Sequence, residues 1–231
     1  EDLSRSGGQV KKGTPESEKS TFNLRKLREE QQRAEAAKLK ELQDKVESEL
    51  RNNAKLSQFS SQIKLDMTRD GLRIQIVDEL NRAMFDSGSA VVQPYMRDLL
   101  REIGAVLAEV PNRLTLEGHT DAQRFAAGDR GYGNWELSSD RANASRRELV
   151  AGGLPDEHVL RVQGLASSQL IEPDNPASPA NRRISIIVMN REAERRVLEP
   201  AAPPDVEPAQ APELVDHKVV EPVSTFVPPA R

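Results

Sequence analysis

Residues 114–121 read LTLEGHTD and residues 134–142 read NWELSSDRA, with a loop between them. The alternating start of the first segment suits a β-strand. In the second segment, Ser138 and Asp140 favour the start of a helix, because such side chains cap its free amides and complement its dipole. This helix is expected to run through Leu149 and to end at the glycine pair that follows. The two segments therefore predict a strand, a polar turn and a helix in succession.

Further strands are predicted on both sides of this segment. Residues 63–67 and 72–76 alternate in polarity around the Arg-Asp-Gly sequence at 69–71. Period-two runs around a turn that contains glycine are typical of a β-hairpin. Residues 159–162 and 184–188 are two more β-rich runs.

A second helix is predicted between the hairpin and the central strand. Apolar side chains at Tyr95, Leu99, Ile103 and Val106 recur at helical spacing, between prolines at 94 and 111. The predicted order is ββ-α-β-α-β-β. This order belongs to the α+β fold class, with the helices covering one face of a single sheet, and it assigns residues 63–199 to one domain.

The N-terminal part divides into two segments. Residues 1–19 carry glycines, a proline and scattered charges without periodicity, which predicts a flexible linker. Residues 20–62 are rich in Glu, Lys, Arg, Gln, Ala and Leu, which predicts a long helix. Its apolar stripe is narrow and includes Leu39, Leu42, Val46 and Leu50.

Two interpretations of this helix remain open from the sequence. The helix is either a spacer or coiled-coil arm that holds the domain away from an anchor, or an amphipathic helix that lies on its own domain. The apolar stripe is too short for the three or four heptads that identify a coiled coil.

Residues 200–231 are predicted to be a disordered tail. They contain eight of the fifteen prolines and no glycine, and two basic against five acidic residues leave a charge of −3. Such a segment cannot assemble a hydrophobic core.

Composition excludes several classes of protein. The 231 residues include no Cys and three His, which excludes disulfide frameworks and thiolate sites and argues against a multi-histidine metal site. No cofactor is expected. The net charge of −4 gives no reason to expect nucleic acid. No apolar run is long enough to cross a bilayer, and the chain begins Glu1-Asp2, so we expect a processed or excised piece of a longer protein.

Two chemistries are conceivable for the polar residues. His119 beside Asp121 resembles an acid–base pair, but no nucleophile elbow, Walker loop or zinc-protease motif accompanies it. Alternatively, Asp121 and Arg141 together suit a zwitterion, because a carboxylate binds an ammonium group and a guanidinium binds a carboxylate. The same two side chains could equally form an internal salt bridge, and their spacing does not decide between these alternatives.

The motif series GHTD, NWELSSDRA and NRR (residues 181–183) closely resembles the OmpA-like peptidoglycan-binding family, over about Ala83 to Met189. The resemblance implies a β-α-β-α-β-β sandwich that binds the peptide stem of peptidoglycan non-covalently. It implies that Asp121 and Arg141 grip the charged groups of meso-diaminopimelate. It also implies a pocket whose further residues are Thr120, Asn134, Leu137 and, at its edge, Arg182 or Arg183.

Two loops depart from the commonest family pattern. Residues 123–133 form a longer loop than in many relatives, and residues 164–166 read GLA in place of a G-x-G turn. Both loops flank the expected pocket, so its shape is expected to differ from that of typical members.

Within the family, the segment MFDSGSA at 84–90, the charged helix and the Pro-rich tail resemble the wall anchors of flagellar-motor stators. That resemblance implies a homodimer in the periplasmic portion of an inner-membrane protein, with a MotA-like membrane subunit as partner. Two alternatives remain: a general envelope tether, such as a lipoprotein or porin-linked domain, and a wall-modifying enzyme.

Overall fold

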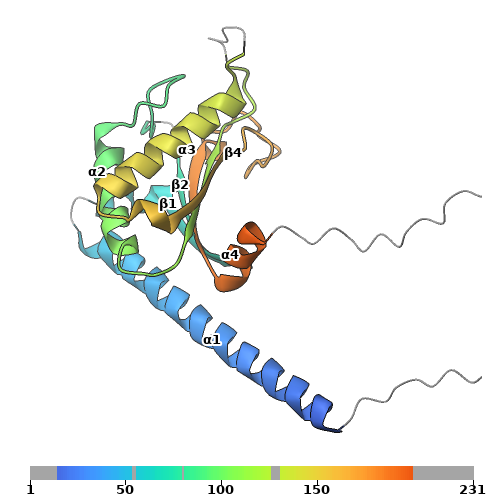
Figure 1. Ribbon diagram of the computed structural model, residues 1–231. Helices are drawn as coiled ribbons and strands as arrows, with labels where there is room; N and C mark the ends of the chain where they lie inside the picture. The colour runs from blue at the N-terminus through green and yellow to red at the C-terminus, as the bar shows by residue number, and fades with distance from the viewer. Residues whose placement is uncertain (1–14, 54–55, 80, 126–130, 200–231) are drawn as a thin grey trace, which may run out of the picture. The chain divides into compact units, whose positions relative to one another are not determined.

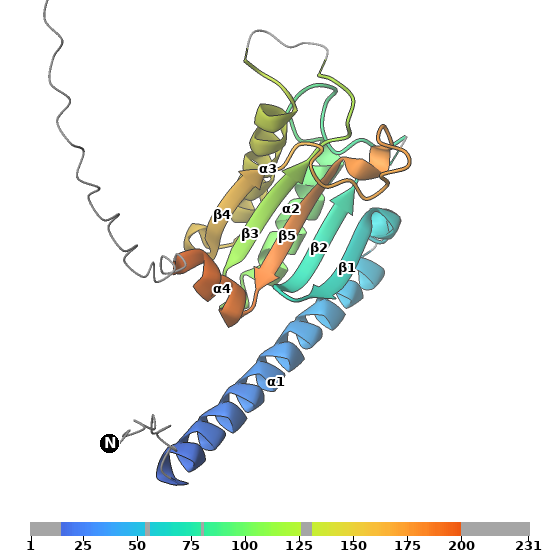
Figure 2. The same cartoon turned by 90° about the vertical axis from the view of Figure 1, so that its right-hand side faces the viewer.

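The computed structural model describes residues 15–53, 56–79, 81–125 and 131–199. Their centre is a five-stranded sheet in the spatial order β1-β2-β5-β3-β4 (Figure 2). The strands are β1 (Ile63–Thr68), β2 (Gly71–Val77), β3 (Leu114–His119), β4 (Val159–Gly164) and β5 (Arg183–Met189). Only β3 and β4 run parallel; the other neighbouring pairs are antiparallel. The last strand of the sequence thus lies in the middle of the sheet.

Two helices, α2 (Pro94–Leu107) and α3 (Asn134–Ala151), cover one face of this sheet (Figures 1 and 2). The connection through α3 joins β3 to β4, as a parallel pair requires. Alternate side chains of the strands point toward the helices and are buried with them in one core. The α+β class and the predicted order of strands and helices are confirmed.

The helix α3 approaches the sheet closely because β3 contains Gly118. A Cβ atom at this position would lie 2.0 Å from the carbonyl oxygen of Ser138 on α3. Any larger residue would therefore push the helix away from the strand. The glycine of the GHTD motif is explained by packing, and the closeness that it allows places α3 beside the end of β3.

The long helix α1 spans Pro15–Asn52, and a short 3₁₀ helix, η1 (Ser57–Gln62), follows it. The helix begins inside the segment predicted as linker, because proline is well suited to a first helical turn. It ends before the predicted residue 62, at an asparagine pair of low helix propensity. A short final helix, α4 (Arg191–Leu198), does not appear in the predicted order.

The two interpretations of α1 apply to different halves of it. The apolar stripe packs into the same core as the sheet, and its members Leu39, Leu42, Val46 and Leu50 are buried. Residues 25–34 are exposed along their whole length and extend away from the sheet (Figure 1). The helix therefore lies on its own domain with one half and projects from it with the other.

Some predictions fall outside the described residues. These are the flexible linker as far as residue 14 and the Pro-rich tail from residue 200. The predicted boundary at residues 62 and 63 separates segments that share one hydrophobic core, since Leu56 and Phe59 pack with Ile63. Among the described helices, none is long and apolar enough to cross a membrane.

The docked half of α1 is expected to contribute directly to stability. Leu42→Ala removes a side chain that is 4% exposed and should lower the free energy of unfolding by about 2–4 kcal/mol. Leu27→Ala is the matched control on the same helix; its side chain is 52% exposed and its change should stay within about 0.5 kcal/mol. Urea denaturation measures both, and equal values would show that the stripe does not hold the helix.

Candidate ligand-binding cavity at the strand ends

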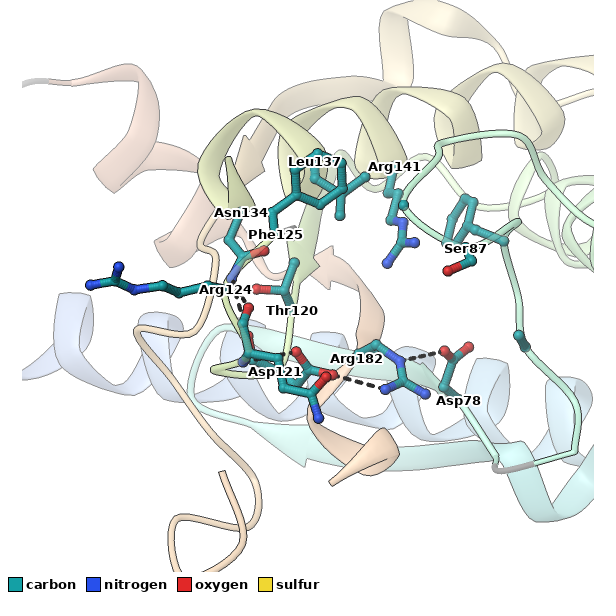
Figure 3. A pocket seen from close by; sticks show the side chains of 14 residues that line it. Asp78, Ser87, Thr120, Asp121, Arg124, Phe125, Asn134, Leu137, Arg141 and Arg182 are labelled. Carbon is teal, nitrogen blue, oxygen red and sulfur yellow. Dashed lines mark hydrogen bonds and ion pairs between the residues drawn. The ribbon is translucent and has the colours of Figure 1, made fainter. Parts of the chain in front are cut away.

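A cavity of about 510 Å³ lies where β2 and β3 end and β5 begins, beside the first turns of α3 (Figure 3). The loop that leads to α2 closes its remaining side. Its lining combines carboxylates, guanidinium groups and apolar side chains: Asp78, Ala83, Phe85, Ser87, Gly88, Thr120, Asp121, Gln123, Arg124, Phe125, Asn134, Leu137, Arg141 and Arg182. Five predicted site residues, all within residues 120–141, therefore share one cavity with Arg182, which lies far from them in the sequence.

Asp121 follows the end of β3 and is 7% exposed. Its Oδ2 accepts a hydrogen bond from Arg182 Nη1 at 2.8 Å, and its Oδ1 accepts one from the amide of Gln123 at 3.1 Å. A carboxylate offers about four acceptor positions, so two remain for a ligand. The neighbouring Thr120 hydroxyl is buried and has no hydrogen-bond partner among the described residues, which adds an unused polar group to the cavity wall.

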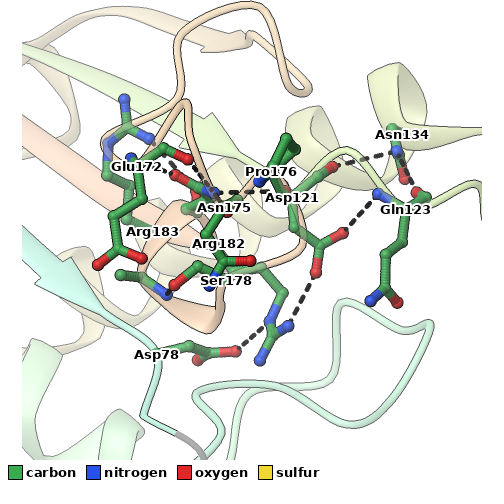
Figure 4. Close-up of polar contacts among 12 residues, drawn as sticks. Asp78, Asp121, Gln123, Asn134, Glu172, Asn175, Pro176, Ser178, Arg182 and Arg183 are labelled. Carbon is green, nitrogen blue, oxygen red and sulfur yellow. Dashed lines mark hydrogen bonds and ion pairs between the residues drawn. The ribbon is translucent and has the colours of Figure 1, made fainter.

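Arg182 joins the two acids of the cavity. Its Nε donates to Asp78 Oδ2 at 2.8 Å while its Nη1 binds Asp121 (Figure 4). Burial lowers the pKa of the Arg182 guanidinium, but hydrogen bonds to both carboxylates outweigh burial and leave the pKa raised. Two carboxylates therefore share the one guanidinium of Arg182 at this end of the cavity.

Arg141 forms the opposite, cationic end. It is 7% exposed, donates from Nε to the Ser89 carbonyl at 2.9 Å, and lies 4.9 Å above the Phe85 ring. Among the residues that the structure describes, it makes no ion pair; the salt bridge of Asp121 is with Arg182 instead. Burial lowers the pKa of Arg141. The guanidinium points into the cavity, where the carboxylates of Asp78 and Asp121 act on its charge without forming an ion pair with it (Figure 3).

The first turns of α3 supply two further walls. Asn134 donates from its side chain to the carbonyl of Gln123 at 2.8 Å, which holds the loop after Asp121 in place. Leu137 is buried and provides an apolar surface. Asn134, Leu137 and Arg141 lie on one face of the helix because they are three and four residues apart.

Of the two predicted edge residues, the structure brings only Arg182 to the cavity. Arg183 is part of β5 and points to the other face of the sheet, where it donates to the carbonyls of Asn181 at 3.2 Å and Gln169 at 2.9 Å (Figure 4). Burial lowers its pKa to about 10. Successive strand residues face opposite sides, so one arginine of the pair must turn away.

The histidine of the GHTD motif also faces away from the cavity. His119 is 2% exposed, neither ring nitrogen has a hydrogen-bond partner among the described residues, and Glu117 Oε2 lies 3.7 Å from Nε2. The pairing of a base with Asp121 that the sequence allowed is therefore not present in the cavity. The described residues contain no cluster of His, Cys, Asp and Glu suited to a metal ion.

Sequence reasoning missed Asp78 and Phe85 as cavity residues. Asp78 directly follows β2 and carries no motif of its own, so no local signal identifies it. Phe85 lies in the MFDSGSA segment, which indicated the family but not a position in the wall. The complete cavity offers an acidic end and a cationic end, an arrangement that suits a ligand with an ammonium and a carboxylate group.

Comparisons with known proteins agree with this fold. The family model described as "OmpA family" matches residues 84–183. Motility protein B of Escherichia coli K12 is 46% identical over 80% of this chain and 60% of its own length. The putative truncated flagellar export/assembly protein LafU of the same strain is 36% identical over 61% of this chain and 65% of its own length. The chain thus spans less than two thirds of either relative.

Two solved structures share the fold. A putative MotB-like protein from Desulfovibrio vulgaris has a TM-score of 0.58 at 16% identity, covering 69% of this chain and 99% of its own. The periplasmic domain of Helicobacter pylori MotB (residues 90–256) has a TM-score of 0.51 at 16% identity, covering 62% and 88%. At such identities the likeness concerns the fold alone.

The buried His119 predicts a pH dependence of stability. Burial lowers its pKa below the ordinary 6.5, more than the nearby Glu117 raises it. The unfolded chain then binds the extra proton first, so the free energy of unfolding should fall as the pH drops below about 6.5. Urea denaturation between about pH 7 and pH 5, above the usual carboxylate range, should show this slope for the wild type and a smaller one for His119→Gln. Identical slopes would contradict it.

Proposed function

From the match of residues 84–183 to the OmpA family model, we propose that the protein anchors a flagellar-motor stator non-covalently to peptidoglycan. The observation that carries the proposal is the cavity with two carboxylates at one end and the unpaired guanidinium of Arg141 at the other. The similarity to motility protein B supports the motor as the setting. It favours this function over a general lipoprotein or porin-linked envelope tether.

The proposed ligand is the meso-diaminopimelate of the peptide stem. Its side chain ends in an ammonium and a carboxylate group on one carbon, and both charges need a partner. Asp121 accepts from the ammonium with the acceptor positions that Arg182 and Gln123 leave free. Arg141 binds the carboxylate through its guanidinium nitrogens, which match a carboxylate in geometry. Thr120, Asn134 and Leu137 line the space between the two ends.

We propose binding without catalysis. The motif histidine lies on the opposite face of the sheet, so Asp121 has no neighbouring base with which to activate a nucleophile. A purely non-covalent contact also suits mechanical anchoring. Several reversible contacts resist force together, while each stator unit can still exchange.

The proposed location is the periplasmic portion of an inner-membrane protein, where the peptidoglycan layer is within reach. A MotA-like membrane subunit is the proposed partner, through a part of the protein outside this sequence. The net charge of −4 gives no reason to propose nucleic acid as a ligand.

We propose that α1 connects the membrane to the wall-binding domain and sets its reach. Its projecting half, residues 25–34, makes no contribution to the core, whereas its second half is docked on the sheet. Undocking of that second half would lengthen the connection. The free energy needed for this undocking is at most the free energy that burial of the apolar stripe contributes to stability.

Dimerisation is proposed because two linked domains bind a polymer far more tightly than one does. Sedimentation equilibrium of this chain tests whether it carries the contact itself. We expect a concentration-dependent increase in mass from monomer to dimer. A constant monomer mass at high concentration would contradict a contact between these residues.

The cavity residues should control retention on the wall. Asp121→Asn removes the charge that binds ammonium and should weaken co-sedimentation with purified sacculi by roughly 10- to 100-fold. Arg141→Lys keeps the charge but loses the two-pronged geometry, and a similar loss is expected. Matched controls are Asp98→Asn on α2 and Arg147→Lys on α3, both exposed and both expected to bind as the wild type does.

The same variants distinguish a binding site from a structural ion pair. Asp121 is buried and paired, so its substitution should also lower the free energy of unfolding, by about 1 kcal/mol. The domain should nevertheless remain folded, because Arg182 keeps Asp78 as a partner. Folded Asp121→Asn and Arg141→Lys variants that still sediment with sacculi like the wild type would overturn the proposed site.

A further inference from the structure

Asp78 occupies an unusual place for a cavity residue. It follows the last residue of β2, six positions before the segment that matches the family model begins. Its side chain is nevertheless buried and lines the same cavity as Asp121. This carboxylate therefore lies outside the segment that matches the family model.

Three hydrogen bonds hold Asp78 in a fixed position. Its backbone amide donates to the carbonyl of Arg182 at 3.0 Å, and its Oδ2 accepts from Arg182 Nε at 2.8 Å. Its Oδ1 accepts from the amide of Met84 at 2.8 Å, which ties it to the loop that closes the cavity. Asp78 and Arg182 are thus linked twice, through the backbone and through their side chains.

This double link determines how Arg182 meets Asp121. A guanidinium that is free to move would bind a carboxylate with two parallel hydrogen bonds and occupy most of its acceptor positions. Because Asp78 holds Nε, Arg182 cannot bind Asp121 through the side-on pair of Nε and Nη, and the contact observed is one hydrogen bond from Nη1 to Oδ2. Asp121 keeps its orientation and also keeps acceptor positions open toward the cavity.

We propose that Asp78 is a positioning residue for ligand recognition: it restrains Arg182 so that Asp121 is oriented but not occupied. The inference rests on the proposed function, since it explains how the acidic end stays ready for an ammonium group. Asp78 acts through Arg182 and does not itself need to contact the ligand.

The test is a double-mutant cycle on binding of the full chain to purified sacculi. Asp78→Asn keeps an acceptor for the Met84 amide but presents an NH₂ group to Arg182. We expect it to weaken binding by roughly tenfold in the wild-type background. In the Arg182→Gln background the same substitution should change binding by less than about twofold, because the residue through which Asp78 acts is gone.

A matched control is Asp66→Asn, which removes an exposed carboxylate paired with Arg73 at 3.3 Å on the same sheet. It should bind sacculi as the wild type does. An equal loss for Asp78→Asn in both backgrounds would overturn the proposal, since it would mean that Asp78 acts independently of Arg182. Wild-type binding by Asp78→Asn, while Asp121→Asn is impaired, would overturn it and leave the proposed function intact.

A second measurement needs neither ligand nor a variant at residue 78. Hydrogen exchange at Arg182 Nε, followed by NMR, should be slow in the wild type and in Asp121→Asn, because Asp78 alone holds that proton. Fast exchange in Asp121→Asn would overturn the restraint. If the wild-type chain fails to sediment with sacculi, the proposed function and the recognition role of Asp78 fall together, whereas fast exchange refutes the restraint alone.

Discussion

The insertion of β5 between β2 and β3 is the constraint on which the cavity depends. The register pairs Val77 with Arg183 on one side and His119 with Arg183 on the other. Arg182 directly precedes β5. It therefore lies between the residue that follows β2, Asp78, and the residues that follow β3, Thr120 and Asp121. Asp78 and Asp121 meet one guanidinium for this reason. No local property of the three segments would bring them together.

The alternation of strand residues divides the polar groups between two faces of the sheet. Thr120 and Arg182 turn toward the cavity, whereas their neighbours His119 and Arg183 turn to the outer face and hold buried positions there. Buried groups on the outer face affect stability and its pH dependence. Groups in the cavity combine moderate stabilisation with free hydrogen-bonding capacity, which is the property that a binding site requires.

The helix α1 shows how one amphipathic segment serves two purposes. Its apolar stripe packs into the core of the domain, so residues 39–50 gain stability from burial. The exposed half before it owes its helical form to a composition of strong helix formers.

Local patterns determined much of this protein from the sequence alone. The hairpin, the helices α2 and α3 and the remaining strands follow from periodicity, turn residues and prolines, which act within a few residues. The motifs also identified Asp121 and Arg141 as cavity residues. Only the tertiary structure decided that Arg182 and not Arg183 reaches the cavity, that Asp78 belongs to it, and that half of α1 is docked. Those outcomes depend on strand order, register and packing between distant segments. Such contacts produce no local sequence pattern, so they could not be predicted from the sequence.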